Sequence, residues 1–340
     1  MPEVRTNLEP PVTVCVPTIG RTVTLRATLD SLKAQTYSNY EVLLLDNASP
    51  PDAEDEISRY VSAEPRASVL RSGVQLPMFD NFQRGVDAAS GRYLAFFHDD
   101  DIYAKDFLTE QVHLLEENPS IGFAGSNWKV IDADGRPAGN RNLIRSTEIW
   151  SGWRYIEALF ALGSNLLPMQ GLLFRRDVLD SQTFGSAKGA HFSDFVILMR
   201  IAEEHDVGLS ARQLITLRSH RDQASLQLDI GESLRLRTAT FTEYCDDLVG
   251  RRPERGSYVK RLRRSIRSAR RSSAVWTWLQ AADSHGAAAS RAALGSEGMD
   301  RWLRHGLQVA DRIGVGGLLR TRRVQRRIKN AAYFVASRTR

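Results

Sequence analysis

The chain has 340 residues, of which 42% are hydrophobic and 25% are charged, and this composition excludes a protein that is disordered throughout. Two cysteines, Cys15 and Cys245, are too few for a disulfide framework. The sequence has no run of about 20 apolar residues and no basic segment followed by an apolar one at its start. We therefore expect neither a spanning helix nor a signal peptide, and we expect a cytoplasmic protein.

The net charge of +6 is unevenly distributed along the chain. From residue 251 onward there are 22 Lys and Arg against 5 Asp and Glu, whereas the first 250 residues hold 24 against 35. This contrast indicates an acidic body joined to a basic C-terminal region. We predict a loose leader over residues 1–11, a catalytic domain over 12–225 and a helical, basic region over 226–340.

Polar residues follow the first two predicted strands. An apolar run over residues 12–16 predicts a strand that ends at Pro17 and Thr18, and a helical pattern over 21–35 follows it. A second apolar run over 41–45 ends at Asp46 and Asn47. A helix over 50–62, a short strand over 68–70 and a helix over 79–89 come next.

The acidic run His98-Asp99-Asp100-Asp101 follows a third apolar strand, predicted over 93–97. Adjacent carboxylates repel one another, so a hard divalent cation with oxygen ligands is one natural partner. The alternative is a polar turn that starts the next helix, with Asp101 as its N-cap. Because ligands of open α/β sheets lie beyond the carboxyl ends of the strands, three polar strand ends favour a single pocket.

The rest of the chain continues this alternation of helices and strands. Helical patterns cover residues 105–117 and 153–162, and a third helix starts near Asp194. A strand pair over 121–132 has its turn at Asp134-Gly135, an apolar stretch covers 169–176, and one or two strands cover 207–218. Beyond about residue 226 the strand signals stop, and everything after that residue has a helical pattern.

The strand ends together resemble those of a family 2 glycosyltransferase, an enzyme that uses nucleotide sugars. Val16-Pro17-Thr18 with Arg21 resembles the opening strand of that family, Asp46-Asn47-Ala48-Ser49 its second strand end, and His98-Asp99-Asp100 its Asp-x-Asp metal motif. The resemblance covers roughly residues 12 to 225. It implies a GT-A fold, that is, a Rossmann-like, mixed but mainly parallel α/β sheet flanked by helices, here with a basic helical C-terminal extension.

The resemblance also implies how the donor is held. Asp46 and Asn47 would contact the nucleotide, Pro17 and Thr18 would pack on its base, and Arg21, Arg84 and Asp99 would contact the rest of the donor, for which we expect a UDP-sugar. His98 replaces the first acid of the metal motif, so the metal would fall to Asp100, and the role of His98 stays open. For Arg84 the alternative is a solvated position on a helix face.

Transfer of a sugar requires that the leaving diphosphate be neutralised and that the acceptor hydroxyl lose its proton. A Mn²⁺ or Mg²⁺ ion on Asp100 would polarise the diphosphate, and the resemblance adds His220 as a late ligand. The resemblance assigns Asp194 as the general base, in a single displacement with inversion. The alternatives are a structural histidine at position 220 and a helix N-cap at position 194.

The acceptor would be a glycan or a lipid-linked glycan. The family places its acceptor-side strand at the apolar stretch over 169–176, which makes Gln170 and Gly171 candidate contacts. A β-bulge is the alternative reading of Gly171.

The basic C-terminal region has segments such as 260–267 and 320–329, in which Arg and Lys alternate with apolar residues. Such segments bind anionic membrane surfaces, so peripheral attachment to the cytoplasmic membrane is one expectation. Contact with a second subunit through Trp276 and Trp278 is another. We expect no nucleic-acid partner because no known binding motif is present.

Two other functions are consistent with parts of the sequence. A nucleotidyltransferase would share the style of fold, but the segment Thr18-Ile19-Gly20-Arg21 lacks the glycine-rich loop that such an enzyme requires. A transferase-like protein that binds a sugar nucleotide without turnover is the alternative that His98 keeps open.

Overall fold

The computed structural model describes residues 11–180, 183–184, 192–220 and 230–266. The chain divides into two compact units. The first comprises residues 1–151, 167–188 and 201–220, and the second comprises 152–166, 189–200 and 221–340. Most of the predicted leader, the basic segment 320–329 and Trp276 and Trp278 lie outside the described residues.

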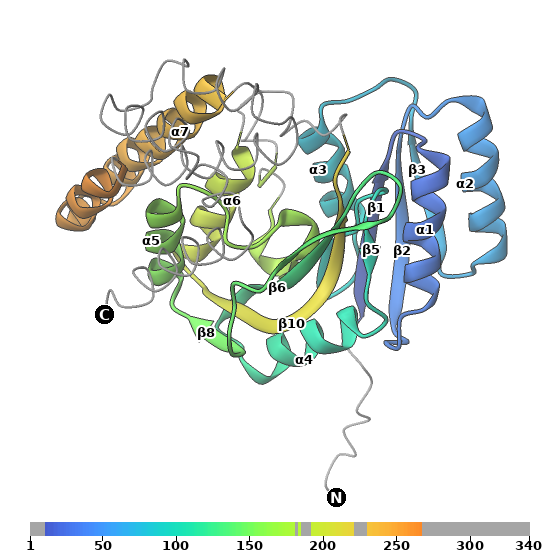
Figure 1. Ribbon diagram of the computed structural model, residues 1–340, viewed down its shortest axis with the longest axis horizontal. Coiled ribbons are helices and arrows are strands. Elements are labelled where there is room, and N and C mark those ends of the chain that lie inside the picture. Colours follow the sequence, from blue (N-terminus) through green and yellow to red (C-terminus); the bar gives the residue numbers. More distant parts are fainter. Residues whose placement is uncertain (1–10, 181–182, 185–191, 221–229, 267–340) are drawn as a thin grey trace, which may run out of the picture. The chain divides into compact units, whose positions relative to one another are not determined.

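The first unit is built on one ten-stranded sheet (Figure 1). Its strands are β1 (Val12–Thr18), β2 (Tyr40–Asn47), β3 (Ala67–Ser72), β4 (Tyr93–Phe96), β5 (Ile102–Tyr103), β6 (Ile121–Ile131), β7 (Pro137–Arg141), β8 (Glu148–Trp150), β9 (Leu173–Arg175) and β10 (Asp206–Arg218). The order is β3-β2-β1-β4-β9-β6-β10-β5, with β7 on β6 and β8 on β10. Strands β3, β2, β1 and β4 run parallel, as do β6 and β10, and the short β9 runs antiparallel between β4 and β6. The predicted fold class, a mixed and mainly parallel α/β sheet of GT-A type, is confirmed.

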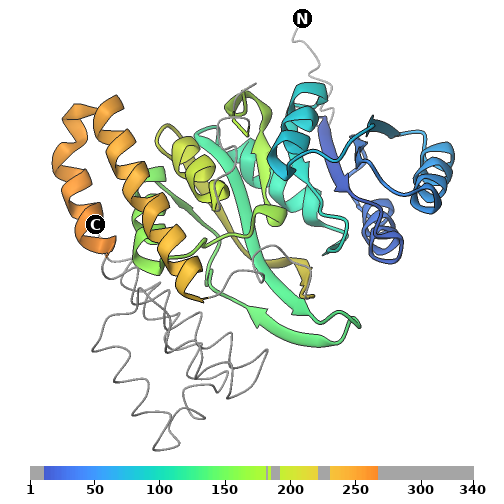
Figure 2. The same cartoon turned by 90° about the horizontal axis from the view of Figure 1, so that it is seen from above.

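In the first unit, helices connect and cover these strands, namely α1 (Thr22–Lys33), α2 (Pro51–Ala63), α3 (Met78–Ala88) and α4 (Phe107–Glu117). The second unit contains α5 (Gly152–Leu162), most of α6 (Ser193–Ala202) and α7 (Ile230–Arg251). Helices α1 and α3 lie on opposite sides of β1 (Figures 1 and 2). This follows from right-handed crossovers, because the chain steps outward from β1 to β3 and then turns back past β1 to β4.

One predicted strand differs from the observed one, and an open prediction for another region is narrowed to a single strand. The stretch 169–176 begins with a 3-10 turn over Met169–Gly171, closed by a hydrogen bond from the Gly171 N–H to the Pro168 carbonyl (3.0 Å), and only Leu173–Arg175 pairs as β9. The region 207–218, for which the sequence predicts one or two strands, forms the single strand β10. It contains a bulge, because Ser210 pairs with Ser126 and Gln213 already pairs with Asn127.

Aromatic packing on both faces fixes the end of β4, where the acidic run begins. On one face Phe96 stacks on Phe82 of α3 with ring centroids 4.5 Å apart. On the other face Phe97 stacks on Tyr103 at 3.4 Å, and both rings meet Phe107 edge to face. Aromatic pairs of this kind contribute about 0.5–1.5 kcal/mol each beyond the area they bury. The strand end is therefore held rigidly from both sides.

The second unit is helical in its described part. Phe241 of α7 contacts Phe160 of α5 at 4.5 Å and Phe195 of α6 at 5.9 Å. After a 3-10 turn over Pro253–Arg255, residues 256–266 form a helix that runs back beside α7 (Figure 2), where Arg263 pairs with Asp246. Residues 230–266 thus follow the helical pattern expected beyond residue 226, and for the rest of that region, which lies outside the described residues, the pattern stays a prediction.

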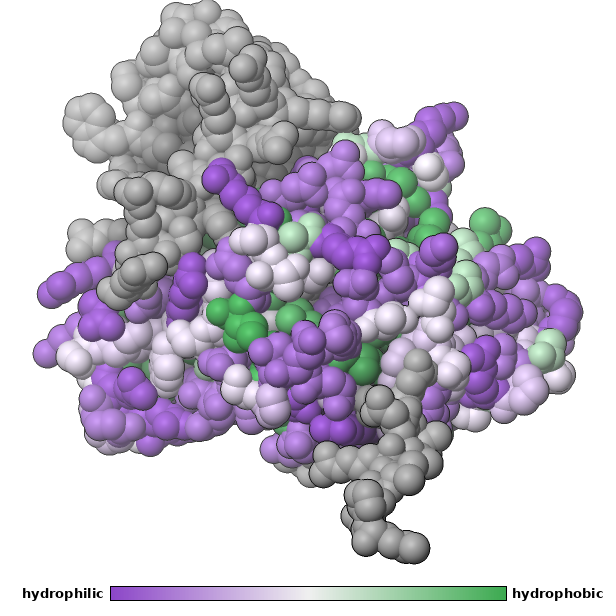
Figure 3. All heavy atoms as spheres, turned by 90° about the horizontal axis from the view of Figure 1, so that it is seen from below, coloured by the Kyte–Doolittle hydropathy of each residue, from purple (hydrophilic) through white to green (hydrophobic). Residues whose placement is uncertain are grey.

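None of the described helices is both long and apolar enough to cross a bilayer. On the face drawn in Figure 3 most of the coloured atoms belong to hydrophilic residues, and the apolar ones occur in small groups among them. This is the distribution expected when the large apolar side chains are packed inside, as Val12, Val14 and Val16 are in β1.

Candidate functional site

The ends of β1, β2 and β4 supply most of the predicted donor-binding residues. Because these three strands are parallel neighbours in the sheet, their carboxyl ends lie at one edge. Thr18 closes β1, Asp46 and Asn47 close β2, and residues 97–101 follow β4. All of them belong to the first unit.

Asp99 is hydrogen-bonded by two residues at and just after the end of β1. The Thr18 hydroxyl donates to Asp99 Oδ2 at 2.7 Å, and Arg21 Nη1 lies 3.2 Å from Asp99 Oδ1. Gly20 has a φ of +88° and its N–H donates to the Thr18 hydroxyl, so the chain turns sharply between Thr18 and Arg21. Both Asp99 oxygens therefore have protein partners, and Asp99 fixes Thr18 and Arg21 in place.

Asp100 contacts both Arg21 and His220. Arg21 Nη1 lies 3.8 Å from Asp100 Oδ2, and His220 Nε2 lies 2.8 Å from the same oxygen. Arg218 holds the chain that leads to His220 beside the acidic run. The Nε of Arg218 donates to the Asp100 carbonyl, and the backbone N–H of Arg218 donates to Asp101 Oδ1. Five predicted residues, Thr18, Arg21, Asp99, Asp100 and His220, thus lie in one cluster.

The turn that carries the acids is fastened from several sides. The Thr28 hydroxyl of α1 lies within hydrogen-bond distance of the carbonyls of Asp101 (2.7 Å) and His98 (3.2 Å). The His98 N–H donates to the Tyr103 hydroxyl, which in turn donates to the Gln170 carbonyl. These bonds leave the backbone of residues 98–101 little freedom, so the side chains are presented in a fixed geometry.

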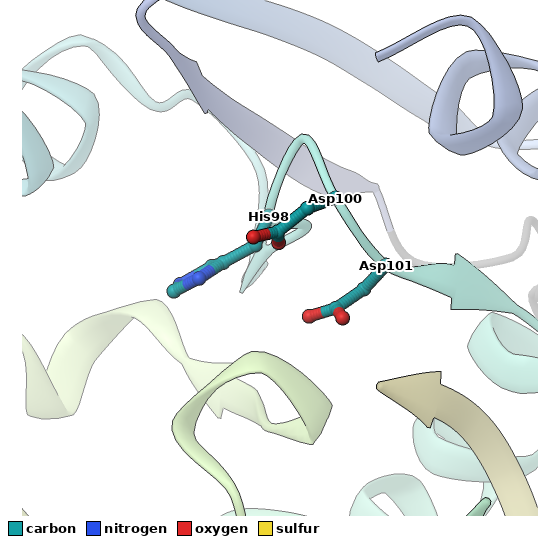
Figure 4. Close-up of side chains that lie close together, drawn as sticks. All are labelled: His98, Asp100 and Asp101. Atoms are coloured by element: carbon teal, nitrogen blue, oxygen red, sulfur yellow. The ribbon is translucent and has the colours of Figure 1, made fainter. Parts of the chain in front are cut away.

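His98, Asp100 and Asp101 form a group suited to a divalent cation (Figure 4). Each offers one ligand atom, and these atoms lie within 4.8 Å of one another. His98 Nε2 is buried and has no hydrogen-bond partner among the described residues. One imidazole nitrogen together with two carboxylates is a donor set that fits Mn²⁺ or a similar ion.

Burial changes the protonation of this group. It lowers the pKa of His98 to about 4, which keeps the imidazole neutral and able to bind a metal. Burial raises the pKa of Asp99, although Thr18 and Arg21 oppose the shift. Burial and the neighbouring Asp100 raise the pKa of Asp101 well above its ordinary value. A bound cation would offset both the burial and the mutual repulsion of the carboxylates.

Asp101 is the residue of this cluster to which sequence reasoning gave no role beyond a helix N-cap. It is 2% exposed and accepts a hydrogen bond from the Arg218 backbone, so it joins the turn to the end of β10. The signal in the sequence was only its position as the third acid in a row. Its partner, 117 residues away, is not visible in that pattern.

The end of β2 forms the predicted nucleotide side. Asp46 is almost fully buried, accepts from the Ser49 N–H at 3.0 Å, and lies 3.7 Å from Arg71. Asn47 exchanges two hydrogen bonds with the backbone of Leu76 and so holds the loop after β3. Pro17 precedes Thr18 in β1, in register with Leu45. Nucleotide contacts by these residues remain a prediction.

Arg84 and the 169–171 turn lie elsewhere in the first unit. Arg84 donates to the carbonyls of Leu70 and Arg71 and to Asn81, so it braces the end of β3. It is therefore not a solvated helix-face residue. The turn that contains Gln170 and Gly171 is tied to the acidic run through the Tyr103 hydroxyl. Acceptor contacts by Gln170 and Gly171 remain a prediction.

Asp194 belongs to the second unit, where it stands in the first turn of α6. Asn165 Nδ2 donates to Asp194 Oδ2 at 3.2 Å, and the Tyr155 hydroxyl donates to Asn165 Oδ1 at 2.9 Å. Burial raises the pKa of Asp194, opposed by Asn165, by the Phe195 N–H and by Arg237. Sequence reasoning missed Tyr155, Asn165 and Arg237, because no local pattern connects them to Asp194.

Residues 13–181 match the sequence profile of Glycosyl transferase family 2. The chain belongs to this glycosyltransferase family. The family resemblance expected from the strand ends is thus confirmed.

Among curated glycosyltransferases, the putative teichuronic acid biosynthesis glycosyltransferase TuaG of Bacillus subtilis is 26% identical over 136 residues, which cover 39% of this chain and 52% of TuaG. The chain thus spans about half of that relative, and two further relatives from Rickettsia are matched over 20% and 18% of their length.

Two solved glycosyltransferase structures share the fold. Residues 1–349 of S. aureus TarS in complex with UDP-GlcNAc have a TM-score of 0.53 at 15% identity, covering 68% of this chain and 66% of TarS 1–349. The mannosyltransferase PcManGT of Pyrobaculum calidifontis, in complex with GDP-Man and Mn²⁺, has a TM-score of 0.52 at 14% identity and covers 97% of this chain and 86% of PcManGT.

Proposed function

We propose that this glycosyltransferase moves a sugar from a nucleotide diphosphate sugar to a glycan or lipid-linked glycan acceptor, with inversion at the anomeric carbon. The observation that carries the proposal is the cluster of Thr18, Arg21, Asp99, Asp100 and His220 at the carboxyl edge of the sheet. TarS, which shares the fold, binds UDP-GlcNAc, and this supports a UDP-sugar as the donor. TuaG belongs by name to teichuronic acid biosynthesis, and this supports a polysaccharide acceptor.

Asp100 would hold the divalent cation, with His98 and Asp101 as the other nearby ligands and His220 as a late ligand. Mn²⁺ is our first choice because the set mixes nitrogen and oxygen, and because PcManGT shares the fold in a complex with Mn²⁺. When bound, the ion supplies Lewis-acid stabilisation of the diphosphate that leaves. Arg21, already positioned by Asp99, would add a positive charge at the same oxygens.

Asp194 would act as the general base. The acceptor hydroxyl gives its proton to the Asp194 carboxylate as its oxygen bonds to the anomeric carbon, and the bond from that carbon to the diphosphate breaks. The electron pair of the broken bond leaves with the nucleoside diphosphate. One carboxylate without a paired nucleophile predicts one displacement and therefore inversion.

A panel of UDP-, GDP- and dTDP-sugars with and without Mn²⁺ tests the proposal. We expect one nucleotide class to raise the melting temperature, more so with Mn²⁺, because a ligand that binds only the folded state stabilises it. Release of the nucleoside diphosphate then measures turnover, and NMR of the product gives its anomeric configuration. Stabilisation without any release would instead favour a binding protein without turnover. No shift with any sugar nucleotide would contradict both functions.

We also propose peripheral attachment to an anionic membrane face through the basic C-terminal region. Its support is the excess of Lys and Arg after residue 250, where 22 basic residues stand against 5 acidic ones. A lipid-linked acceptor would be met at that surface.

A further inference from the structure

Asn165 lies between a fully buried tyrosine and the carboxylate of Asp194. The Tyr155 hydroxyl on α5 lies 2.9 Å from Asn165 Oδ1, and Asn165 Nδ2 lies 3.2 Å from Asp194 Oδ2. All three residues belong to the second unit. The arrangement is a short chain of hydrogen bonds that ends on the carboxylate.

The chain of hydrogen bonds has a fixed direction. The Tyr155 hydroxyl donates to the amide oxygen of Asn165. The NH₂ group of the same Asn165 amide therefore faces Asp194. Tyr155 is 0% exposed and stands on a helix, so its hydroxyl has little freedom to turn elsewhere. The amide is thereby oriented before any substrate arrives.

Asn165 donates to Oδ2 of the Asp194 carboxylate, and the backbone N–H groups of Asp194 and Phe195 also donate to this carboxylate. The Phe195 backbone and Asn165 favour the ionised form of Asp194, and burial opposes it. Two titratable groups face Asp194 from the helices around it, Tyr155 on α5 and the largely buried Arg237 on α7. Asn165 donates a side-chain hydrogen bond to the carboxylate.

We propose that Asn165, oriented by Tyr155, is the positioning residue of the general base, holding Asp194 Oδ2 so that the carboxylate is ionised and its other oxygen faces the acceptor. This inference rests on the proposed role of Asp194 as the base. Asn165 itself touches no reacting atom.

The test titrates the Asp194 carboxyl carbon by NMR in the full-length protein labelled with ¹³C at the aspartate side-chain carboxyl. The Asp194→Asn spectrum assigns the signal. In Asn165→Leu we expect the Asp194 titration to move up by about one pH unit or more, because a hydrogen bond to the charged form is lost. Asn165→Asp has nearly the same shape and should move it further, since a second carboxylate repels the first.

Tyrosine variants separate this effect from a general loss of packing. Tyr155→Phe should move the titration in the same direction by a smaller amount. Tyr258→Phe is the matched control, because its hydroxyl donates to the Trp153 carbonyl in the same unit and not to this chain of hydrogen bonds, so it should leave the titration unchanged.

Turnover provides the second readout. The donor is the sugar nucleotide that gives the largest thermal shift, and water is the acceptor. As the pH is lowered, the hydrolysis rate of Asn165→Leu should begin to fall at a higher pH than that of wild type. The KM for that donor should stay within about twofold. An unchanged Asp194 titration in both Asn165→Leu and Asn165→Asp would overturn the inference.

The role of Asp194 is tested separately. If Asp194→Asn hydrolyses the donor at the wild-type rate, the base assignment is wrong even where Asn165 shifts the titration. If Asp194→Asn is inactive and the Asn165 variants titrate as wild type, the inference about Asn165 alone is wrong. Should Asn165→Leu fail to fold, the result for the isosteric Asn165→Asp decides.

Discussion

The carboxylates of the two units are held by different means. In the first unit, Asp99 and Asp100 follow a strand and meet cationic groups, Arg21 and His220, brought to the same sheet edge. In the second unit, Asp194 stands at a helix start and accepts a hydrogen bond from a neutral amide, Asn165, with one cationic group, Arg237, also facing it. Groups that bind a diphosphate and a cation require opposite charges nearby, whereas a base requires a free oxygen whose proton affinity is adjusted.

The contacts of the carboxylates in the two units also differ in how they bring together residues that are distant in the sequence. The bond between Thr18 and Asp99 spans 81 residues, yet both ends follow strands that pair side by side, so sheet topology alone brings them together. Asn165 and Asp194 are 29 residues apart and belong to no common sheet. Their meeting depends on how α5, α6 and α7 pack, through Phe160, Phe195 and Phe241.

The largest expected effect separates the two carboxylates by function. Asp100→Ala should lower turnover by roughly 10²–10³-fold and also weaken Mn²⁺-dependent donor binding, because the leaving diphosphate loses its counter-ion. Asp194→Ala should lower turnover by roughly 10²–10⁴-fold and leave donor binding nearly unchanged. Turnover assays and calorimetry with the stabilising sugar nucleotide measure both.

The exposed Asp52 in the first turn of α2 provides a control for these variants, and Asp52→Ala should behave as wild type. An equal loss of donor affinity in Asp100→Ala and Asp194→Ala would erase the distinction between the two sites.

A smaller effect is expected at the two ends of β1. Thr18→Val keeps the side-chain shape but removes the hydrogen bond to Asp99, and donor affinity should fall by about tenfold. Thr13→Val is the matched control at the opposite end of the strand, where the hydroxyl bonds Glu41 and the Gly91 N–H. It should lower the midpoint of urea unfolding without changing donor affinity. Equal donor affinity in the two variants would mean that the Thr18 contact serves stability alone.

Stability should respond to pH at Asp194. Burial raises the pKa of Asp194 in the folded protein. The folded protein therefore binds the proton of the Asp194 carboxyl more tightly than the unfolded chain does. The contribution of Asp194 to stability therefore falls as pH rises from the ordinary aspartate pKa through the raised one. Asp194→Asn should melt at a higher temperature than wild type at pH 7, and the difference should shrink toward pH 4.

Asp247→Asn is the control for that measurement, because Asp247 pairs with Arg200 and Arg251 and its loss should lower the melting temperature at pH 7. A lower melting temperature of Asp194→Asn at pH 7 would show that the ionised carboxylate stabilises the second unit.

The smallest effect concerns membranes. Within the described part of the basic region, Arg261 lies 3.8 Å from Glu157, Arg263 pairs with Asp246 and Arg255 covers the Trp153 ring, so several cations already have partners. We expect the full-length protein to co-sediment moderately with anionic vesicles and to be released by about 0.5 M salt, at which surface charges are screened. Equal sedimentation with neutral vesicles would show that charge does not drive the binding.

The sequence by itself determined the first unit in large part. Apolar runs that end in polar residues predicted β1, β2 and β4, and parallel pairing then places Thr18, Asp46 and Asp100 at one edge. Local pattern is enough there, because the period of a strand and the position of its end are encoded in adjacent residues.

The tertiary structure alone decided what surrounds each of these groups. It inserted β9 antiparallel between β4 and β6, joined Asp101 to Arg218, grouped His98 with Asp100 and Asp101, and set Asn165 against Asp194. Such contacts join residues without a common period or motif. They arise from the packing of elements that are distant in the sequence. The free energy of that packing depends on many residues together and cannot be predicted from any short stretch of the chain.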